Sequence, residues 1–217
     1  MSSGRPQSGA EVGVFDYGSG NLHSACQALE AAGARVHLSS QTLQLERFTR
    51  LVVPGVGAFA ACMAQLRSAG GVEFIREWVA SGRQLLGICV GHQILFERGV
   101  EHGREAQGIG IYPGAVTRLS SPVLPHMGWN TVEAAAHSEL FDRIGDQRFY
   151  FVHSYGAHGP VPEQAKVTWA EHEGDRFIAA LEYGPVCSTQ FHPEKSGAAG
   201  AQLLRNWLAR RCPDMVG

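Results

Sequence analysis

Residues 84–93 read QLLGICVGHQ, and they decide the architecture of the chain. The apolar run 84–88 predicts a buried strand, and the segment after it predicts a helix over residues 91–97. Cys89 lies between them in a G-x-nucleophile-x-G pattern, where a sharp turn exposes the middle residue and needs small neighbours. At a helix N-terminus the dipole would also stabilise a thiolate. A buried structural cysteine between two glycines fits equally well, so both interpretations stay open.

The same alternation of strand and helix continues on the N-terminal side of this turn. Strands are predicted at 11–15, 35–38 and 51–53, and helices at 21–32 and at 59–81 with a break near Gly70-Gly71. Beyond residue 100 the pattern changes to short strands separated by Gly, Pro and Ser, followed by a closing helix. These later elements are predicted at 116–119, 131–134, 148–152, 167–171, 177–182, 186–191 and, for the helix, 198–210. The pattern predicts an α/β fold whose central, mostly parallel sheet is flanked by helices and carries an added antiparallel portion.

Length and composition exclude several classes of protein. A chain of 217 residues fits one domain, which we expect over residues 11–217 after a disordered tail at 1–10. A net charge of −2 without a basic run argues against a nucleic-acid partner, and the longest apolar stretch is too broken for a membrane span. Five cysteines without a CxxC pair indicate reduced thiols and a cytoplasmic location.

A second candidate group lies at residues 190–194, which read QFHPE. His192 follows Cys89 by 103 residues, so only folding could bring the two together. If the segment ends a strand, His192 and Glu194 share one face, and Glu194 could orient the imidazole toward the thiol. That order of nucleophile, base and orienting acid is the logic of a catalytic triad. A surface turn with a solvated histidine is the alternative.

A third candidate feature is PGVG at residues 54–57, at the end of a predicted strand. An acyl-transfer enzyme needs backbone N–H groups aimed at the developing oxyanion, and glycines allow such close approach. The N–H of Val90 would be one donor, and a peptide within Gly55, Val56 and Gly57 would supply the other. An ordinary strand-ending turn explains the same residues.

Three longer stretches carry a resemblance to a known family. They are LVVPGVGAF at 51–59, LLGICVGHQILFERG at 85–99 and STQFHPEKSG at 188–197. Together they resemble the class I (triad) glutamine amidotransferases over nearly the whole chain after the tail. The resemblance implies a flavodoxin-like core and a Cys89–His192–Glu194 triad. Such a triad hydrolyses glutamine to glutamate and ammonia through a glutamyl thioester, without metal or organic cofactor.

Four shorter motifs refine the resemblance within that family. They are DYGSGN at 16–21, PGVGAF at 54–59, PHMGWN at 125–130 and YFVHSY at 150–155. They are similar to motifs of the glutaminase subunits of imidazole glycerol phosphate synthases, which act in histidine biosynthesis. This likeness implies a cyclase partner, a (β/α)₈ barrel that receives the ammonia in a heterodimer. Asn21 and Trp129 resemble residues at that interface, although Trp129 could instead belong to the core.

The resemblance also implies residues that hold glutamine. Gln93 lies one helical turn from Cys89 and resembles a glutamine-contacting residue, and Glu101 resembles a carboxylate that meets the α-ammonium group. His153, Ser154 and Tyr155 resemble residues that border the pocket. A solvated Glu101 and a merely polar strand end at 153–155 are the alternatives. His92 stands where relatives carry Met, so we expect it to be structural or at the rim of the site.

Three rival interpretations remain. The chain could be the glutaminase of another ammonia-channelling synthase, such as pyridoxal phosphate synthase. Gly18-Ser19-Gly20 after a strand could indicate a nucleotide-binding oxidoreductase, although His23 stands in place of the third glycine. A catalytically silent subunit that only supports a partner is the third. Because Gly55 and Gly57 allow a peptide to turn, we also hypothesise that the oxyanion peptide rests in an unproductive orientation until the partner binds its substrate.

Overall fold

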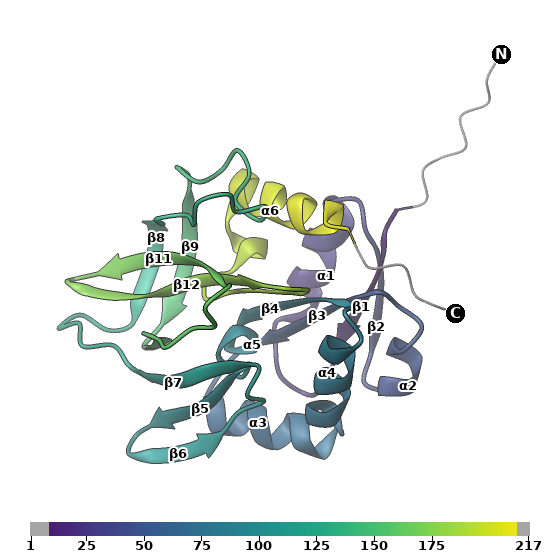
Figure 1. Ribbon diagram of the computed structural model, residues 1–217, viewed down its shortest axis with the longest axis horizontal. Coiled ribbons are helices and arrows are strands. Elements are labelled where there is room, and N and C mark those ends of the chain that lie inside the picture. The colour runs from purple at the N-terminus through teal and green to yellow at the C-terminus, as the bar shows by residue number, and fades with distance from the viewer. Residues whose placement is uncertain (1–8, 212–217) are drawn as a thin grey trace.

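The computed structural model describes residues 9–211, and a central seven-stranded sheet organises it (Figure 1). The sheet order is β11-β12-β13-β4-β3-β1-β2. Every neighbouring pair from β13 to β2 is parallel, whereas β11, β12 and β13 pair antiparallel. The order β2-β1-β3-β4 is that of a flavodoxin-like core. The predicted α/β class, with an antiparallel portion added to a parallel sheet, is confirmed.

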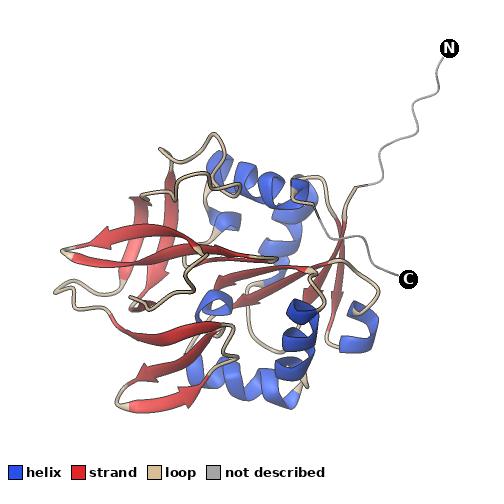
Figure 2. Ribbon diagram, viewed as in Figure 1, coloured by secondary structure: helices blue, strands red, loops and turns tan. Residues whose placement is uncertain are grey.

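The helices and strands follow one another along the chain as in Figure 2. In chain order they are β1 Glu11–Phe15, α1 Leu22–Ala31, β2 Arg35–Ser39, α2 Thr42–Leu45, β3 Arg50–Gly55, α3 Phe59–Ser68, α4 Gly71–Ala80, β4 Gln84–Cys89, α5 Val90–Gln93, β5 Phe96–Glu101, β6 Arg104–Gln107, β7 Tyr112–Arg118, β8 His126–Thr131, β9 Arg148–His153, β10 Tyr155–Ala157, β11 Lys166–His172, β12 Asp175–Tyr183, β13 Val186–Thr189, the 3₁₀ turn η1 Pro193–Lys195 and α6 Gly197–Ala209.

Helices cover both faces of the central sheet. In Figure 1, α1 and α6 lie on one face, and α3 and α4 lie on the other. Every residue of β4 is buried, as expected for a central parallel strand covered on both sides. On α6 the side chains of Leu203, Leu204 and Trp207 are buried in the core, and Leu208 is partly buried. The closing helix predicted at 198–210 is therefore confirmed, and it packs one apolar face on the core.

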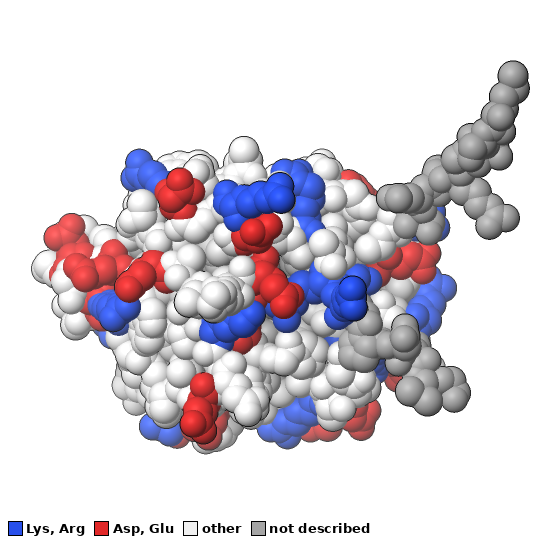
Figure 3. Space-filling view, turned by 45° about the horizontal axis from the view of Figure 1, so that its top comes forward, with Lys and Arg blue, Asp and Glu red and all other residues white. Residues whose placement is uncertain are grey.

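Two smaller sheets extend the molecule beside the central one. A four-stranded sheet has the order β10-β7-β5-β6, and β8 pairs with β9 in an antiparallel hairpin. Lys and Arg are interspersed with Asp and Glu on the face drawn in Figure 3, in keeping with the near-zero net charge. None of the helices within residues 9–211 is long and apolar enough to span a bilayer.

Two predicted elements are wrong. The helix predicted at 91–97 ends at Gln93, and the chain then enters β5 at Phe96. Ile94 and Leu95 are buried in a turn and Phe96 is buried at the start of a strand paired with β7, so burial there does not require a helix. The strand predicted at 131–134 lies too late, because β8 ends at Thr131 and only an isolated bridge joins Glu133 to Trp169. The predicted disordered tail falls almost wholly on residues 1–8, outside the described residues.

Candidate functional site

The three candidate segments end at the same edge of the central sheet. In the parallel register, Gly55 at the end of β3 pairs with Cys89 at the end of β4. Thr189, which ends β13, pairs with Ile88, and His192 follows three residues later. Parallel strands bring their carboxyl ends to one edge, which is where ligands bind in open α/β sheets.

Cys89 has a strained backbone conformation in a very tight turn. Its φ of 57° and ψ of −112° are unusual for a residue with a side chain. A Cβ on Gly91 would overlap the carbonyl oxygen of Val53, and a Cβ on Gly87 would come within 2.6 Å of the Gly91 carbonyl oxygen. Both flanking glycines are therefore required for the turn. Because α5 has only four residues, its dipole contributes less at Cys89 than the predicted longer helix would.

His192 and Glu194 form a buried pair. His192 Nδ1 lies 2.7 Å from Glu194 Oε1, and their side chains are 2% and 3% exposed. The two residues do not share a strand face as predicted, because Glu194 lies in η1 and the turn brings its carboxylate back to the ring. The backbone of His192 is fixed to β9, since its N–H donates to the Tyr150 carbonyl at 2.9 Å. The Ser196 hydroxyl donates to the His192 carbonyl at 2.6 Å and accepts from the Tyr150 N–H.

The second ring nitrogen of His192 lies on the side of Cys89. Burial on its own lowers the pKa of His192, but the neighbouring Cys89 and Glu194, through hydrogen bonding and charge, raise it to about 9. Among the described residues, the buried Nε2 meets no partner in full hydrogen-bond geometry, so it is available to the thiol. Catalytic hydrogen bonds are often loose before substrate binds. The arrangement can transfer a proton from the thiol to the imidazole.

Cys89 and His192 line a common cavity of about 230 Å³. Most of the other lining residues also come from the segments singled out in the sequence. The cavity is lined by Val56, Gly57, Cys89, Val90, Gln93, Glu101, Val152, His153, Ser154, Tyr155, His192 and Lys195. A volume of this size suits a small molecule such as an amino acid. Among the described residues, no group of three His, Cys, Asp or Glu side chains is arranged as a metal site.

Comparison with known families agrees with this geometry. The family model described as "Glutamine amidotransferase class-I" matches residues 13–210. This chain belongs to the class-I glutamine amidotransferases. The match spans the sheet, the Cys89 turn and the segment with His192 and Glu194. The chain is therefore an amidotransferase rather than a nucleotide-binding oxidoreductase.

Several curated amidotransferase relatives share one name. An imidazole glycerol phosphate synthase subunit HisH from Leifsonia xyli is 57% identical over 204 residues, which cover 91% of this chain and 97% of that protein. The HisH subunit from Nocardia farcinica is 58% identical over 207 residues, covering 91% and 96%. Among solved structures, a glutamine amidotransferase superposes with a TM-score of 0.72 at 21% identity, covering 91% of this chain and 97% of that one. The structure of PurLQS from Thermotoga maritima superposes with a TM-score of 0.71 at 19% identity, covering 92% of this chain and 98% of that one. These two structures show a shared fold.

The segment predicted to supply oxyanion donors surrounds one side of the amidotransferase cavity. Val56, Gly57 and Val90 line it, whereas Gly55 lies behind them. The N–H of Val56 donates to the Ser19 hydroxyl at 3.3 Å, and that hydroxyl donates to the Val56 carbonyl at 2.8 Å. The thiol of Cys62 donates to the same carbonyl at 3.3 Å. Ser19 therefore holds the peptides on both sides of Val56, and Cys62 holds the one that follows it, roles that the sequence analysis missed.

The residues predicted to contact glutamine all line the cavity, but the side chains of Gln93, Glu101 and His153 also make hydrogen bonds within the fold. Gln93 Nε2 donates to the Tyr155 carbonyl, and Glu101 Oε2 accepts from the Phe59 N–H at 3.1 Å. His153 Nδ1 lies 2.9 Å from the Tyr155 carbonyl. Ser154 completes this side of the cavity. Lys195 lines the cavity as well and was not singled out, although it directly follows the His-Pro-Glu motif.

The two predicted interface residues and His92 also lie away from the cavity lining. Asn21, just before α1, is exposed. Trp129 on β8 is 47% exposed, so the alternative that it belongs to the core is wrong. His92 is fully buried, with Nδ1 2.7 Å from the Ser188 hydroxyl, and burial lowers its pKa to about 3. It is a structural residue, one of the two roles expected for it.

Proposed function

We propose that this chain hydrolyses glutamine at Cys89 and supplies the ammonia as the glutaminase subunit of an imidazole glycerol phosphate synthase. The observation that carries the proposal is the strained Cys89 in the same cavity as the buried His192–Glu194 pair. The high identity to curated HisH subunits over almost their full length supports the choice of synthase.

The chemistry proceeds in two halves. His192 accepts the thiol proton, and the Cys89 sulfur attacks the carboxamide carbon of glutamine. Protonated His192 then gives that proton to the leaving nitrogen, ammonia departs, and a glutamyl thioester remains. His192 next takes a proton from water, which attacks the thioester and releases glutamate and the Cys89 thiol. Glu194 holds the ring by its Nδ1–H and stabilises its charged form.

Oxyanion stabilisation requires a change in the peptide between Gly55 and Val56. The N–H of Val90, directly after the nucleophile, serves as one donor. The N–H of Val56 is engaged by Ser19, so it must turn toward the cavity to serve as the second. A turn of this peptide is sterically cheap because Gly55 precedes it. We infer that binding of a loaded cyclase favours the turned peptide and so raises glutaminase activity.

The partner is a cyclase subunit of (β/α)₈-barrel type. Met127 and Trp129 support a contact surface on β8, because they are two residues apart on one face and are 61% and 47% exposed. Exposed aromatic and Met side chains are enriched at protein interfaces. Asn21 is a second exposed contact in this proposal. Ammonia passes directly to the cyclase, since in bulk water it would be protonated.

The decisive experiment measures glutamate release in the presence of the cyclase and its substrate. Wild type is active, and Cys89→Ala has no activity above background. Cys26→Ala is the matched control, because Cys26 is a half-buried thiol on α1, outside the cavity lining. Activity that survives Cys89→Ala would refute the site. Cyclisation with added ammonia should persist in the Cys89→Ala complex, which separates loss of glutaminase from loss of assembly.

A further inference from the structure

A chain of hydrogen bonds leads from β8 to the cavity through two buried histidines. Asn130 Nδ2 lies 3.2 Å from His126 Nε2. His126 Nδ1 lies 2.9 Å from His153 Nε2. His153 Nδ1 in turn lies 2.9 Å from the Tyr155 carbonyl oxygen. Gln93 Nε2 donates to that same oxygen at 2.9 Å. The chain therefore ends at an amide that lines the cavity.

The direction of every bond follows from the cavity end of this chain. The Tyr155 carbonyl only accepts, so His153 Nδ1 carries a hydrogen and donates it. A neutral imidazole has one N–H, so His153 Nε2 accepts, and His126 Nδ1 must donate to it. His126 Nε2 is then an acceptor as well. Both rings are therefore in the Nδ1–H form, with both nitrogens engaged.

The contacts of Asn130, at the outer end of this series of hydrogen bonds, give the same donor and acceptor assignments independently. Asn130 Oδ1 accepts from the Thr131 N–H at 2.8 Å, and its Nδ2 donates to the Glu171 carbonyl at 2.8 Å. These contacts fix Nδ2 as the end that faces His126, where an acceptor is required. Because the two ends agree, a second proton on either ring would place two donors face to face.

The surroundings keep both rings neutral. Burial lowers the pKa of His153 to about 3, and the Tyr155 carbonyl only partly opposes this. Burial and His172 lower the pKa of His126 to about 4. The titratable groups that act on His153 are all histidines, namely His126, His172 and His92. Neither ring therefore changes charge near neutral pH.

The consequence at the cavity concerns the side chain of Gln93. Besides the Tyr155 carbonyl, its Nε2 donates to Gln190 Oε1 at 2.9 Å, so both of its N–H groups are engaged. That leaves the amide oxygen as the group that Gln93 offers to a molecule in the cavity. An acceptor oxygen recognises a donor, such as an ammonium or carboxamide N–H group of glutamine. His153 lines the cavity, but both of its ring nitrogens are engaged within the fold.

We propose that His126 and His153 are positioning residues of the glutaminase, which fix the Tyr155 carbonyl and thereby turn the Gln93 amide oxygen toward glutamine. Glutamine binding then depends on His126, a ring outside the cavity lining. The proposal rests on the cavity being the glutamine site. It assigns His153 a role behind the substrate rather than a hydrogen bond to it.

The kinetic test compares two substitutions of His126 in the complex with the cyclase. His126→Phe keeps the ring but removes the donor to His153, so KM for glutamine rises about tenfold while kcat stays within about twofold. In His126→Asn the amide nitrogen takes the position of Nδ1, so KM returns to within about threefold of wild type. The matched control is His172→Phe, because His172 stacks on His126 with ring centroids 4.2 Å apart but lies outside the chain. Its KM stays at the wild-type value.

A wild-type KM in His126→Phe overturns the proposal. An equal loss in all three variants, or a loss of kcat alone, also overturns it, because both point to a general structural role. If wild type itself releases no glutamate, the proposed function is wrong, and the role assigned to Gln93 is then wrong as well.

A second measurement does not depend on activity. Nitrogen-15 NMR of the wild-type complex without glutamine should show His126 and His153 as Nδ1–H rings that do not titrate between about pH 5 and 8. In His126→Phe, burial keeps His153 neutral, but the Nε2 resonance of His153 should shift because this nitrogen no longer accepts a hydrogen bond. Nε2–H rings, or titration in wild type, would overturn the proposal even if the enzyme is fully active.

Discussion

At the scale of single residues, the pair formed by His192 and Glu194 determines how the site responds to pH. Glu194 reaches the ring from within a 3₁₀ turn, and both side chains are nearly inaccessible to solvent. A buried carboxylate beside an imidazole favours the charged ring, which the burial alone would disfavour. The protonation of His192 is therefore the property most sensitive to a change at Glu194.

Glu194→Gln should lower the pKa of His192 and slow the enzyme. The ring loses one of the two partners that raise its pKa, so the pKa falls below about 9, while Cys89 continues to raise it. The value of kcat should fall by about 10²-fold, because the ring is no longer oriented by a carboxylate. NMR titration of His192 and glutamate-release kinetics check both effects. Glu73→Gln, at an exposed position on α4, is the control.

The same pKa predicts how stability depends on pH. Because the folded pKa lies above 6.5, protonated His192 stabilises the folded chain fully below about pH 6.5. This contribution is lost as the pH rises toward about 9. Wild type should therefore lose free energy of unfolding across that range, and Glu194→Gln should lose less. Urea titrations at several pH values compare them, and parallel curves for the two proteins would contradict the assignment.

Ser19→Ala should release the peptide at Val56. The Ser19 hydroxyl contacts both the N–H and the carbonyl of Val56, so its removal makes the turned peptide easier to reach. Glutaminase activity without cyclase substrate should rise about fivefold, which corresponds to one hydrogen bond of about 1 kcal/mol. The stimulation by that substrate should shrink. Ser68→Ala, at an exposed position on α3, should leave both unchanged. Unaltered basal activity in Ser19→Ala would contradict the proposal that Ser19 holds the Gly55–Val56 peptide in its unproductive orientation.

At the scale of elements, strands with buried apolar runs were the most predictable part of the fold. β3 and β4 are almost wholly buried, and each carries an apolar run after a polar first residue. After Gln93, the predicted strands overlap β7, β9, β11, β12 and β13, whereas β5, β6 and β10 were not predicted. Their burial comes from a second sheet formed with distant strands, and one sequence window contains no information about such partners.

The candidate site was predictable where the backbone itself imposes the residue type. The two glycines around Cys89 leave a signal because any larger side chain would meet neighbouring backbone. Ser19, Cys62 and His126 left none, because they act through tertiary contacts made after folding. His192 and Glu194 were named correctly as neighbours, but through a turn that alternation along a strand does not describe.

Gly91→Ala should disrupt the turn between β4 and α5. The new methyl group would overlap the backbone carbonyl of Val53, which is fixed within the central sheet and cannot move aside. The free energy of unfolding should fall by about 3 kcal/mol, at the upper end of the range for overpacking. Gly145→Ala is the control, because its added methyl would meet only Ala134 Cβ at 3.3 Å. Chemical denaturation measures both, and equal stability of the two variants would contradict the steric argument.

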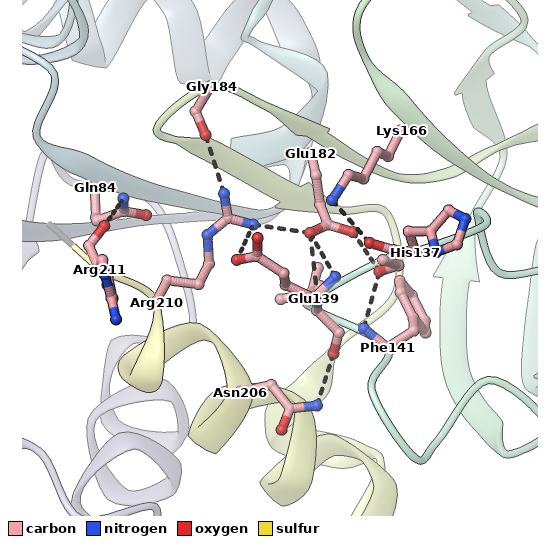
Figure 4. Close-up of polar contacts among 12 residues, drawn as sticks. Gln84, His137, Glu139, Phe141, Lys166, Glu182, Gly184, Asn206, Arg210 and Arg211 are labelled. Carbon is pink, nitrogen blue, oxygen red and sulfur yellow. Dashed lines mark hydrogen bonds and ion pairs between the residues drawn. The ribbon is translucent and has the colours of Figure 1, made fainter.

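At the scale of the whole molecule, a buried ion pair fastens the end of α6 to the central sheet (Figure 4). Arg210 Nη1 lies 2.8 Å from Glu182 Oε2 on β12, and Nη2 donates to the Gly184 carbonyl at 3.0 Å. Glu182 is 4% exposed and also accepts from the Ser138 hydroxyl and from the N–H groups of residues 139 and 140. The contact joins three distant parts of the chain.

Arg210→Met should destabilise the fold by about 3 kcal/mol, because it leaves a buried carboxylate without its cation. Arg205→Met on the same helix is the control, because Arg205 is exposed and its side chain contacts Gln202. That substitution should change the free energy of unfolding by less than about 0.5 kcal/mol. Thermal and urea unfolding measure the difference, and similar values for the two variants would show that the ion pair contributes little.

Strand β8 carries both the proposed docking surface and the proposed positioning residue, because its exposed side chains alternate with the buried His126. Trp129→Ala should weaken cyclase binding about 30-fold, or roughly 2 kcal/mol, because a large aromatic anchor is lost from the interface. Since Trp129 is half-exposed, the isolated subunit should unfold as wild type does. Leu43→Ala is the control, because Leu43 is 76% exposed on α2, beside β2 at the far edge of the sheet (Figure 1). Titration calorimetry gives the affinities.

At saturating cyclase, KM for glutamine in Trp129→Ala should equal that of wild type, because the hydrogen-bonded chain through His126 and Asn130 uses the opposite face of the strand. An increase in KM that persists at saturation would instead mean that this face helps to order the glutamine site.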